Sequence, residues 1–144
     1  MSARRIVAPM DLPPGRLSPL GRARLVAEIL AAYFPLLRFV RRNDLRAMVA
    51  EARAVGRAVA LSDNPHVVAA RLGGIVGATL KVLPTDGRCL IQSLVLVRLL
   101  ARRSIAVRVV IGVRAGDAFA AHAWVEHDAV PVLPAGRFER LMEL

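Results

Sequence analysis

The chain contains one cysteine, Cys89, and a histidine, His122, that stands 33 positions further on. Cys89 opens an apolar run typical of a helix, and His122 lies in the strand-like segment 121–126. The separation leaves room for one helix, a turn and a strand, so a fold can bring the two side chains together. A thiol beside an imidazole is the arrangement from which Cys–His nucleophiles are built.

The residues around Cys89 favour its thiolate form. Segment 83–88 is rich in turn-forming residues, so the helix begins at Cys89 or one residue before it. A thiol in the first turn lies near the positive end of the helix dipole, and Arg88 acts in the same direction, whereas Asp86 opposes it or caps the helix. A single cysteine is otherwise most often a small buried apolar residue, and a single histidine in a strand is most often structural.

Length and composition indicate one domain with a substantial core, because the chain has 144 residues and 56% of them are hydrophobic. One cysteine excludes an intramolecular disulfide. No histidine or carboxylate stands at zinc-ligand spacing from it, so we expect no metal and no cofactor. Residues 1–15 lack the apolar core of a signal peptide, and the longest apolar stretch, 25–40, is too short and too charged to span a membrane. We expect a cytoplasmic protein with a hydrophobic surface for a partner.

The charge is strongly positive and unevenly distributed. The net charge is +10, and residues 1–88 carry +8 of it, against +2 for residues 89–144. A basic face can bind nucleic acid, but only 4% of the residues are aromatic, which argues against a stacking platform for single strands. We therefore expect no specific nucleic-acid binding, and interpret the arginines as a solvated face or a surface for an acidic protein or peptide.

Hydrophobic spacing and capping residues predict helices over the first two thirds of the chain. Residues 1–17 are rich in proline and should be irregular. Ser18, followed by a proline, starts a helix that runs toward Phe34, where Pro35 bends or breaks it. Further helices are expected over residues 44–59 (capped by Asn43 or Asp44), 65–80 and 89–103, the last of them apolar nearly all round and therefore central.

The periodicity then changes to that of strands. β-branched and aromatic residues predict strands over 106–113, 119–126 and 130–133, joined by turns, and 137–144 as a last helical turn or two. The fold class is therefore α+β, with N-terminal helices followed by a catalytic-cysteine helix packed on a small antiparallel sheet. We expect one domain over 18–144, made of a helical part (18–83) and a Cys/His core (84–144).

Two motifs, in this order, resemble the lasso-peptide biosynthesis B proteins, which are cysteine proteases of the transglutaminase-like superfamily. The first is Arg88-Cys89-Leu90 with Ser93-Leu94. The second is Phe119-Ala120-Ala121-His122-Ala123-Trp124-Val125-Glu126, preceded by Val110-Ile111-Gly112-Val113. The resemblance is strongest over residues 84–141 and is closest to the stand-alone leader-peptidase form.

The resemblance implies a papain- or transglutaminase-like core and a peptidase that removes the leader from a ribosomally made precursor peptide. In that family a separate small protein commonly binds the leader, and a cyclase related to asparagine synthetase closes the macrolactam ring. This sequence shows no winged-helix recognition region, so we expect the leader-recognition protein to be a separate chain, with the cyclase as a further partner.

Carried over to this sequence, the resemblance makes Cys89 the nucleophile and His122 the general base, which later protonates the leaving amine. Trp124 lies on the same strand face as His122 and either shields the ion pair from water or packs in the core. Three residues at the start of the cysteine helix either line the cleft or make local contacts: Arg88, Gln92 and Ser93.

The residue that orients the imidazole is less clearly marked. The wider family places an acid on the strand after the histidine, but residues 133–135, which oppose His122 if the turn is centred on 128–129, contain none. Asp128 is near in sequence, and Glu126 shares the face of His122. The site is thus a dyad, or a triad completed by one of these acids, by a backbone carbonyl or by a residue from elsewhere.

Two other histidines, His66 and His127, are expected at the surface. Two other functions fit the same residues. One is a transglutaminase-like acyl transferase, which passes the acyl group to an amine instead of water. The other is a partner-binding module in which the basic helical half docks a protein and the Cys89 thiol is inert.

Overall fold

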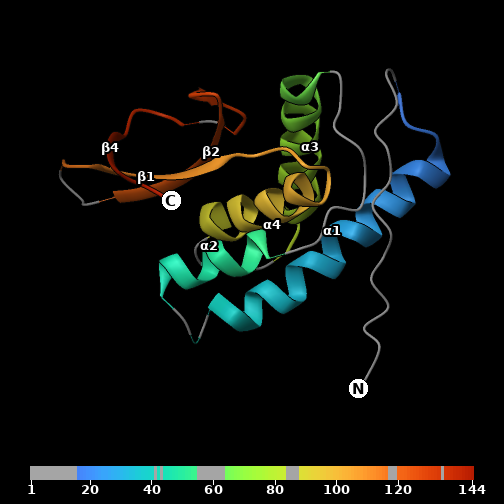
Figure 1. Cartoon of the computed structure of the whole chain (residues 1–144), viewed down its shortest axis with the longest axis horizontal. Helices are drawn as coiled ribbons and strands as arrows, with labels where there is room; N and C mark the ends of the chain where they lie inside the picture. The colour runs from blue at the N-terminus through green and yellow to red at the C-terminus, as the bar shows by residue number, and fades with distance from the viewer. Residues whose placement is uncertain are drawn as a thin grey trace.

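The computed structural model describes residues 16–40, 42, 44–54, 64–83, 88–116, 120–133 and 135–144. Within these ranges the chain is α+β, as expected, with helices on one side and an antiparallel sheet on the other (Figure 1). The sheet has the strand order β3-β2-β1-β4. The elements are α1 (Pro19–Val40), α2 (Leu45–Arg53), α3 (Pro65–Leu80), α4 (Arg88–Arg102), β1 (Arg108–Arg114), β2 (Ala120–His127), β3 (Val130–Pro131) and β4 (Glu139–Glu143).

Helix α1 begins where the sequence predicts, because the Ser18 Oγ accepts a hydrogen bond from the Gly21 N–H at 3.0 Å. Of the two expectations at Pro35, a bend or a break, the break is wrong, since α1 continues through this residue to Val40. A proline removes one backbone hydrogen bond of the helix. Tyr33 and Leu36, on either side of Pro35, are 3% and 0% exposed in the core, and their burial holds the helix together across this point.

The starts of α2 and α3 also follow their local signals. Asp44 caps α2 by accepting a hydrogen bond from the Ala47 N–H at 2.8 Å. The expected continuation of this helix to residue 59 falls largely outside the described residues. Helix α3 has Pro65 in its first turn, and Gly73 brings its backbone against the chain after β3, since a Cβ there would lie 2.5 Å from the Val132 carbonyl oxygen.

Helix α4 is the centre of the molecule. It packs against α1, α2, α3 and β2, and its largest apolar side chains have no exposed surface: Leu94, Leu96, Leu99 and Leu100. This confirms the sequence-based prediction of a central, buried cysteine helix. None of the helices in the described ranges combines the length and apolarity that crossing a bilayer requires.

Strands β1 and β2 form the middle of the sheet, with Gly112 opposite His122 and Arg108 opposite Glu126. The turn from β2 to β3 falls on Asp128 and Ala129, as predicted. Both have positive φ angles, 49° and 64°, as a two-residue type I′ hairpin requires. Strand β3 is shorter than expected, because only Val130 and Pro131 pair with β2 in the sheet.

The C-terminal segment differs from the expectation of a helical turn. Residues 139–143 form β4, an edge strand antiparallel to β1. Leu144 and Val109 extend this pairing by exchanging two backbone hydrogen bonds of 2.8 and 2.9 Å. The free edge of β1 offers these bonds to any short segment that reaches it, so tertiary context overrides local propensity here.

A buried ion group joins α1 to the end of α4. Glu28 is 1% exposed and accepts two hydrogen bonds of 2.8 Å from the Arg103 guanidinium. Arg102 lies 3.7 Å from the same carboxylate, and burial lowers the pKa of its guanidinium, against the opposing effect of Glu28. The geometry fixes the orientation of α1 on the core.

Candidate active site and an adjacent cavity

Cys89 lies in the first turn of α4, where the sequence places it. Its free thiol belongs to a partly buried residue, and its backbone carbonyl accepts a hydrogen bond from the Ser93 Oγ at 2.8 Å. Ser93 is 0% exposed, so of the two roles considered for it, lining the cleft and making a local contact, its position fits the local hydrogen bond. Gln92 is partly buried, whereas Arg88 is exposed and donates to the Leu83 carbonyl at 3.2 Å.

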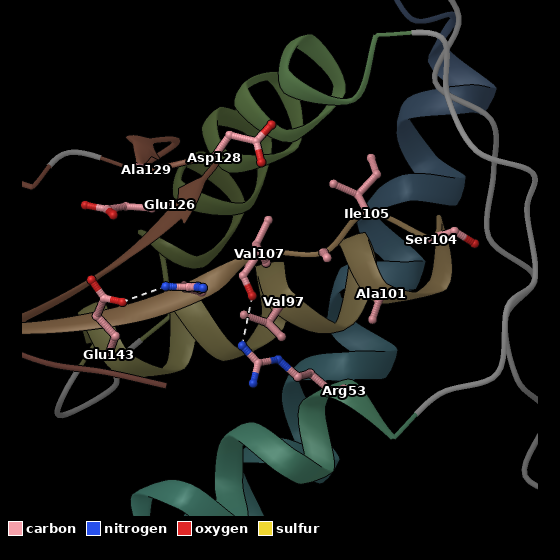
Figure 2. Close-up of a pocket in the computed structure, with 12 residues that line it drawn as sticks. Arg53, Val97, Ala101, Ser104, Ile105, Val107, Glu126, Asp128, Ala129 and Glu143 are labelled. Carbon is pink, nitrogen blue, oxygen red and sulfur yellow. Dashed lines mark hydrogen bonds and ion pairs between the residues drawn. The ribbon is translucent and has the colours of Figure 1, made fainter.

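A cavity of about 750 Å³ lies toward the other end of α4 (Figure 2). Val97 and Ala101 of the helix line it, together with the connection to β1, the β2–β3 turn and Arg53 of α2. The Arg53 side chain reaches across to the sheet by donating 2.8 Å hydrogen bonds to the carbonyl oxygens of Val107 and Leu144. No local pattern in the sequence indicates this cavity, because its walls come from elements that are far apart in the chain.

His122 lies on β2 and is surrounded by aromatic rings. Its ring centroid is 5.0 Å from that of Phe138, at an interplanar angle of 29°, and 6.0 Å from that of Trp124, at 22°. Phe138 in turn lies under the Arg114 guanidinium, 5.1 Å away. Phe138 was not predicted as a site residue, because the segment that carries it was expected to be helical.

Trp124 is fixed by both shape and hydrogen bonding. It is 3% exposed, and its ring lies over Gly112, where a Cβ would come within 2.7 Å of a ring carbon. Its indole N–H donates to the Glu126 Oε1 at 2.9 Å. Both alternatives for Trp124, core packing and proximity to the imidazole, are therefore compatible with its position.

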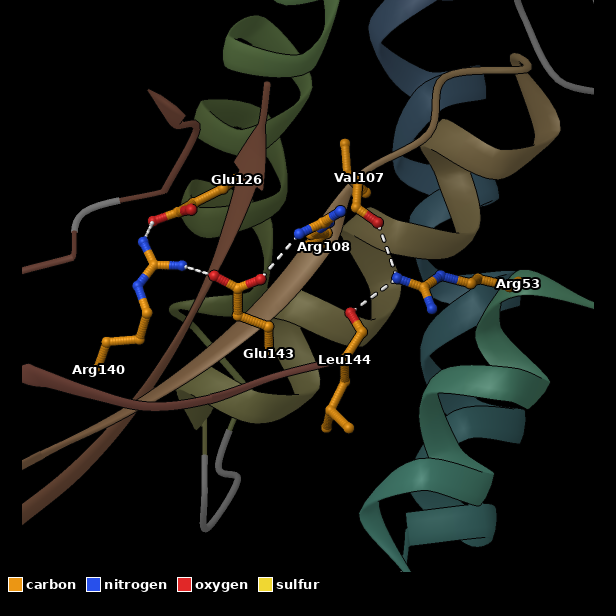
Figure 3. A network of polar contacts seen from close by, with 7 residues as sticks. All are labelled: Arg53, Val107, Arg108, Glu126, Arg140, Glu143 and Leu144. Carbon is orange, nitrogen blue, oxygen red and sulfur yellow. Dashed lines mark hydrogen bonds and ion pairs between the residues drawn. The ribbon is translucent and has the colours of Figure 1, made fainter. Parts of the chain in front are cut away.

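Glu126 belongs to a polar ladder, defined here as Glu126, Arg140, Glu143 and Arg108 (Figure 3). The Arg140 guanidinium donates to Glu126 at 2.8 Å and also pairs with Glu143. Arg108 donates to Glu143 at 2.8 Å, and these arginines, Arg108 most strongly, lower the pKa of the Glu143 carboxyl. The Glu126 carboxylate therefore accepts hydrogen bonds from both the Trp124 indole and the Arg140 guanidinium.

Asp128 stands in the exposed hairpin turn, where its side chain is 88% exposed and its Oδ2 lies 3.8 Å from the His127 Nε2. His127 was expected at the surface, which is wrong: it is 8% exposed, and its ring packs 5.6 Å from that of His66 at the start of α3. The cause is strand alternation, which points His127 to the face opposite Glu126 and toward α3.

The β2–β3 register also locates the position opposite His122. Glu126 faces Pro131, and the Val132 N–H donates to the Val125 carbonyl at 2.8 Å. Extending this register would put residue 135, an alanine, opposite His122. Because β3 ends at Pro131, the described part of the strand does not reach the position opposite His122.

The contacts above join His122 to Trp124 and Phe138, and Cys89 to Ser93 of its own helix. The pairing of the Cys89 thiol with the imidazole stays a prediction from the sequence. Across the described ranges, no three histidine, cysteine or carboxylate side chains are grouped as a metal ion would require.

The chain carries a cysteine at the start of its central helix and a histidine on a strand of the sheet that this helix contacts. The family model of the transglutaminase-like superfamily matches residues 7–143, nearly the whole chain, and the protein belongs to that superfamily. Its members are generally enzymes of the cysteine-protease type. No curated protein and no solved structure matches the chain.

Proposed function

We propose that the protein is a cytoplasmic cysteine peptidase that removes the leader from a lasso precursor peptide, with Cys89 as nucleophile and His122 as general base. The observation that carries this proposal is the thiol in the first turn of α4, a helix that packs on the strand bearing His122. Membership of the transglutaminase-like superfamily supports it, and the motifs around both residues add the substrate class.

In the proposed reaction, His122 takes the proton of the Cys89 thiol, and the thiolate forms a bond to the carbonyl carbon of the scissile peptide. Backbone N–H groups at the start of α4 have no partner within the helix and stabilise the oxyanion. The imidazolium then protonates the leaving amine as the C–N bond breaks, which gives a thioester. Water, deprotonated by His122, hydrolyses the thioester and releases the free thiol.

We favour a dyad in which the aromatic neighbours of the imidazole, rather than an acid, fix its orientation. Trp124 and Phe138 restrict the ring, and Glu126 acts on it indirectly by holding the indole N–H. A triad completed by Glu126 or Asp128 is the alternative. It predicts that Asp128→Asn or Glu126→Gln reduces turnover at saturating peptide concentration.

The first test is the rate of Cys89 alkylation as a function of pH. Wild type should be alkylated faster than His122→Ala at neutral pH, because the imidazole takes the proton of the Cys89 thiol. Cys89→Ala should retain the fold and abolish leader removal. Free-thiol behaviour that is indifferent to His122 would favour the inert-thiol binding module, and a fully active Cys89→Ala protein would refute the assignment.

The alternative is an acyl transferase, which would use the same two residues and also fits membership of the transglutaminase-like superfamily. Mass analysis of the product separates the two reactions, because hydrolysis leaves a free carboxylate and transfer leaves a new amide. We also propose a separate leader-recognition protein as partner, with the macrolactam-forming cyclase acting afterwards. Cleavage should therefore accelerate when the leader-recognition protein is added.

A further inference from the structure

The cavity at the C-terminal half of α4 has an apolar floor and charged walls. Val97, Ile105 and Val107 line the floor. One wall is the β2–β3 turn with Asp128, and the opposite wall is Arg53 of α2 (Figure 2). An apolar surface between separated polar groups suits a ligand with a hydrophobic body and a charged end.

The charged side chains that line the cavity differ in whether they have partners within the protein. Arg53 is held by two backbone carbonyls, and Arg108 is paired with Glu143. Asp128, by contrast, has no arginine or lysine partner in the part of the chain that the structure describes, and its nearest basic group is His127 at 3.8 Å. Among the charged side chains that line this space in the described ranges, the Asp128 carboxylate is therefore the one engaged neither by an arginine nor by a backbone hydrogen bond, and it is available to a cationic group.

The cavity lies at a defined distance from the candidate nucleophile. Val97 and Ala101 follow Cys89 on the same helix by 8 and 12 positions. At 1.5 Å per residue the separation along the axis is about 12 to 18 Å. An extended peptide rises about 3.3 Å per residue, so about four to six residues span it.

We propose that this cavity is a second binding site for the peptide substrate, about four to six residues from the scissile bond. It takes an apolar side chain on Val97 and Ile105 and a lysine or arginine side chain beside Asp128. The identification of the ligand as substrate rests on the proposed function, whereas the preference for an apolar, cationic peptide rests on the cavity alone.

Binding to the full-length Cys89→Ala protein tests the site without catalysis. The probes are two fluorescein-labelled synthetic peptides, Gly-Ser-Leu-Val-Lys-Gly-Ser and the same sequence with glutamate in place of lysine. Fluorescence anisotropy should show the lysine peptide binding about tenfold more tightly. Asp128→Asn should bring the two affinities within about twofold, because asparagine tolerates the positive φ of this turn and removes only the charge.

Ala101→Trp should fill the cavity and weaken binding of the lysine peptide by about tenfold. Matched controls are Ala27→Trp, at an exposed position of α1, and Glu139→Gln, on the exposed β4, and both should bind as the parent does. Equal affinities of the two peptides, or binding that is indifferent to both Ala101→Trp and Asp128→Asn, would overturn the proposal. Asp128→Asn keeps the test decisive if the tryptophan variant does not fold.

The outcome for the cavity is separable from that for the peptidase. If the peptides bind as expected but wild type cleaves no precursor, the cavity is a peptide site and the proposed function fails. If wild type cleaves a precursor and Ala101→Trp cleaves it with the same KM, the peptidase stands and the second site is excluded.

Discussion

At the scale of single residues, β2 carries the candidate base together with Trp124 and Glu126 on the same strand face. Strand alternation predicts that His122, Trp124 and Glu126 share a face, and the structure links the last two by a hydrogen bond. The bond depends only on residues two positions apart, which is why the sequence could anticipate the grouping. The contribution of Phe138 depends on the path of the chain after β3, which no local pattern encodes.

Replacing Glu126 should test this hydrogen bond. Glu126→Leu leaves the buried indole N–H without its acceptor, so we expect a loss of about 1–3 kcal/mol of unfolding free energy. Glu126→Gln keeps an acceptor oxygen and should lose less. Trp124 is the only tryptophan, so urea unfolding followed by its fluorescence measures both variants. Equal losses for leucine and glutamine would contradict the role of the bond.

Ala129 has a backbone conformation that suits its residue type poorly. Its φ angle of 64° lies in the left-handed region, which disfavours a residue with a Cβ. Ala129→Gly should therefore raise the free energy of unfolding by about 1 kcal/mol, as measured by chemical denaturation. Ala121→Gly, on the exposed part of β2, is the control and should not stabilise the protein.

At the scale of elements, Gly112 is where three strands and the site meet. It opposes His122 of β2 and Arg140 of β4, next to an irregularity in the β1–β4 pairing. A Cβ at this position would meet the Trp124 ring at 2.7 Å and the Glu139 carbonyl oxygen at 2.9 Å. The close approach explains a glycine within a run of β-branched residues.

Gly112→Ala should consequently displace either Trp124 or β4. We expect a loss of about 1–3 kcal/mol of stability together with a shift of the Trp124 emission maximum. Gly116→Ala is the matched control, because a Cβ there meets no atom within 4 Å. An unchanged emission maximum in a destabilised Gly112→Ala protein would assign the strain to β4 rather than to Trp124.

The docking of β4 should depend on pH. The arginines of the polar ladder hold the pKa of Glu143 below its usual 4.5. A depressed pKa means that the contribution is present above about pH 4.5 and is lost as the pH falls through the folded-state value. As the pH falls below about 4.5, hydrogen-exchange protection should drop more for the β4 amides than for the β2 amides. Glu143→Gln should abolish this difference, and an equal drop in both strands of wild type would argue against a role of Glu143 in docking β4.

At the scale of the whole molecule, the buried Glu28 fastens the N-terminal helix to the core. Glu28→Ala would leave Arg103 buried without its carboxylate, so we expect a loss of about 3–5 kcal/mol in chemical denaturation. The partly exposed pair of Arg98 and Glu51, 3.5 Å apart, provides the comparison. Glu51→Ala should cost less than about 1 kcal/mol, and a similar cost for both would contradict the special role of Glu28.

The sequence by itself determined the features that depend on neighbours in the chain. The cap at Ser18, a cap at residue 43 or 44, the start of the cysteine helix, the face shared by His122 and Trp124, and the turn at 128–129 all follow from local hydrogen bonding and periodicity. The α+β class follows from the order of these elements, and the superfamily match agrees with it.

Only the tertiary structure decided the features that depend on partners far away in sequence. The segment 139–143 is a strand because the edge of β1 is free, α1 passes through Pro35 because its flanks are buried, and His127 is covered by α3. The cavity beside α4 likewise exists only where several elements converge. In each case, burial and pairing between distant segments outweigh local preferences, which are about 1 kcal/mol or less for most residues and about 3 kcal/mol for a proline inside a helix.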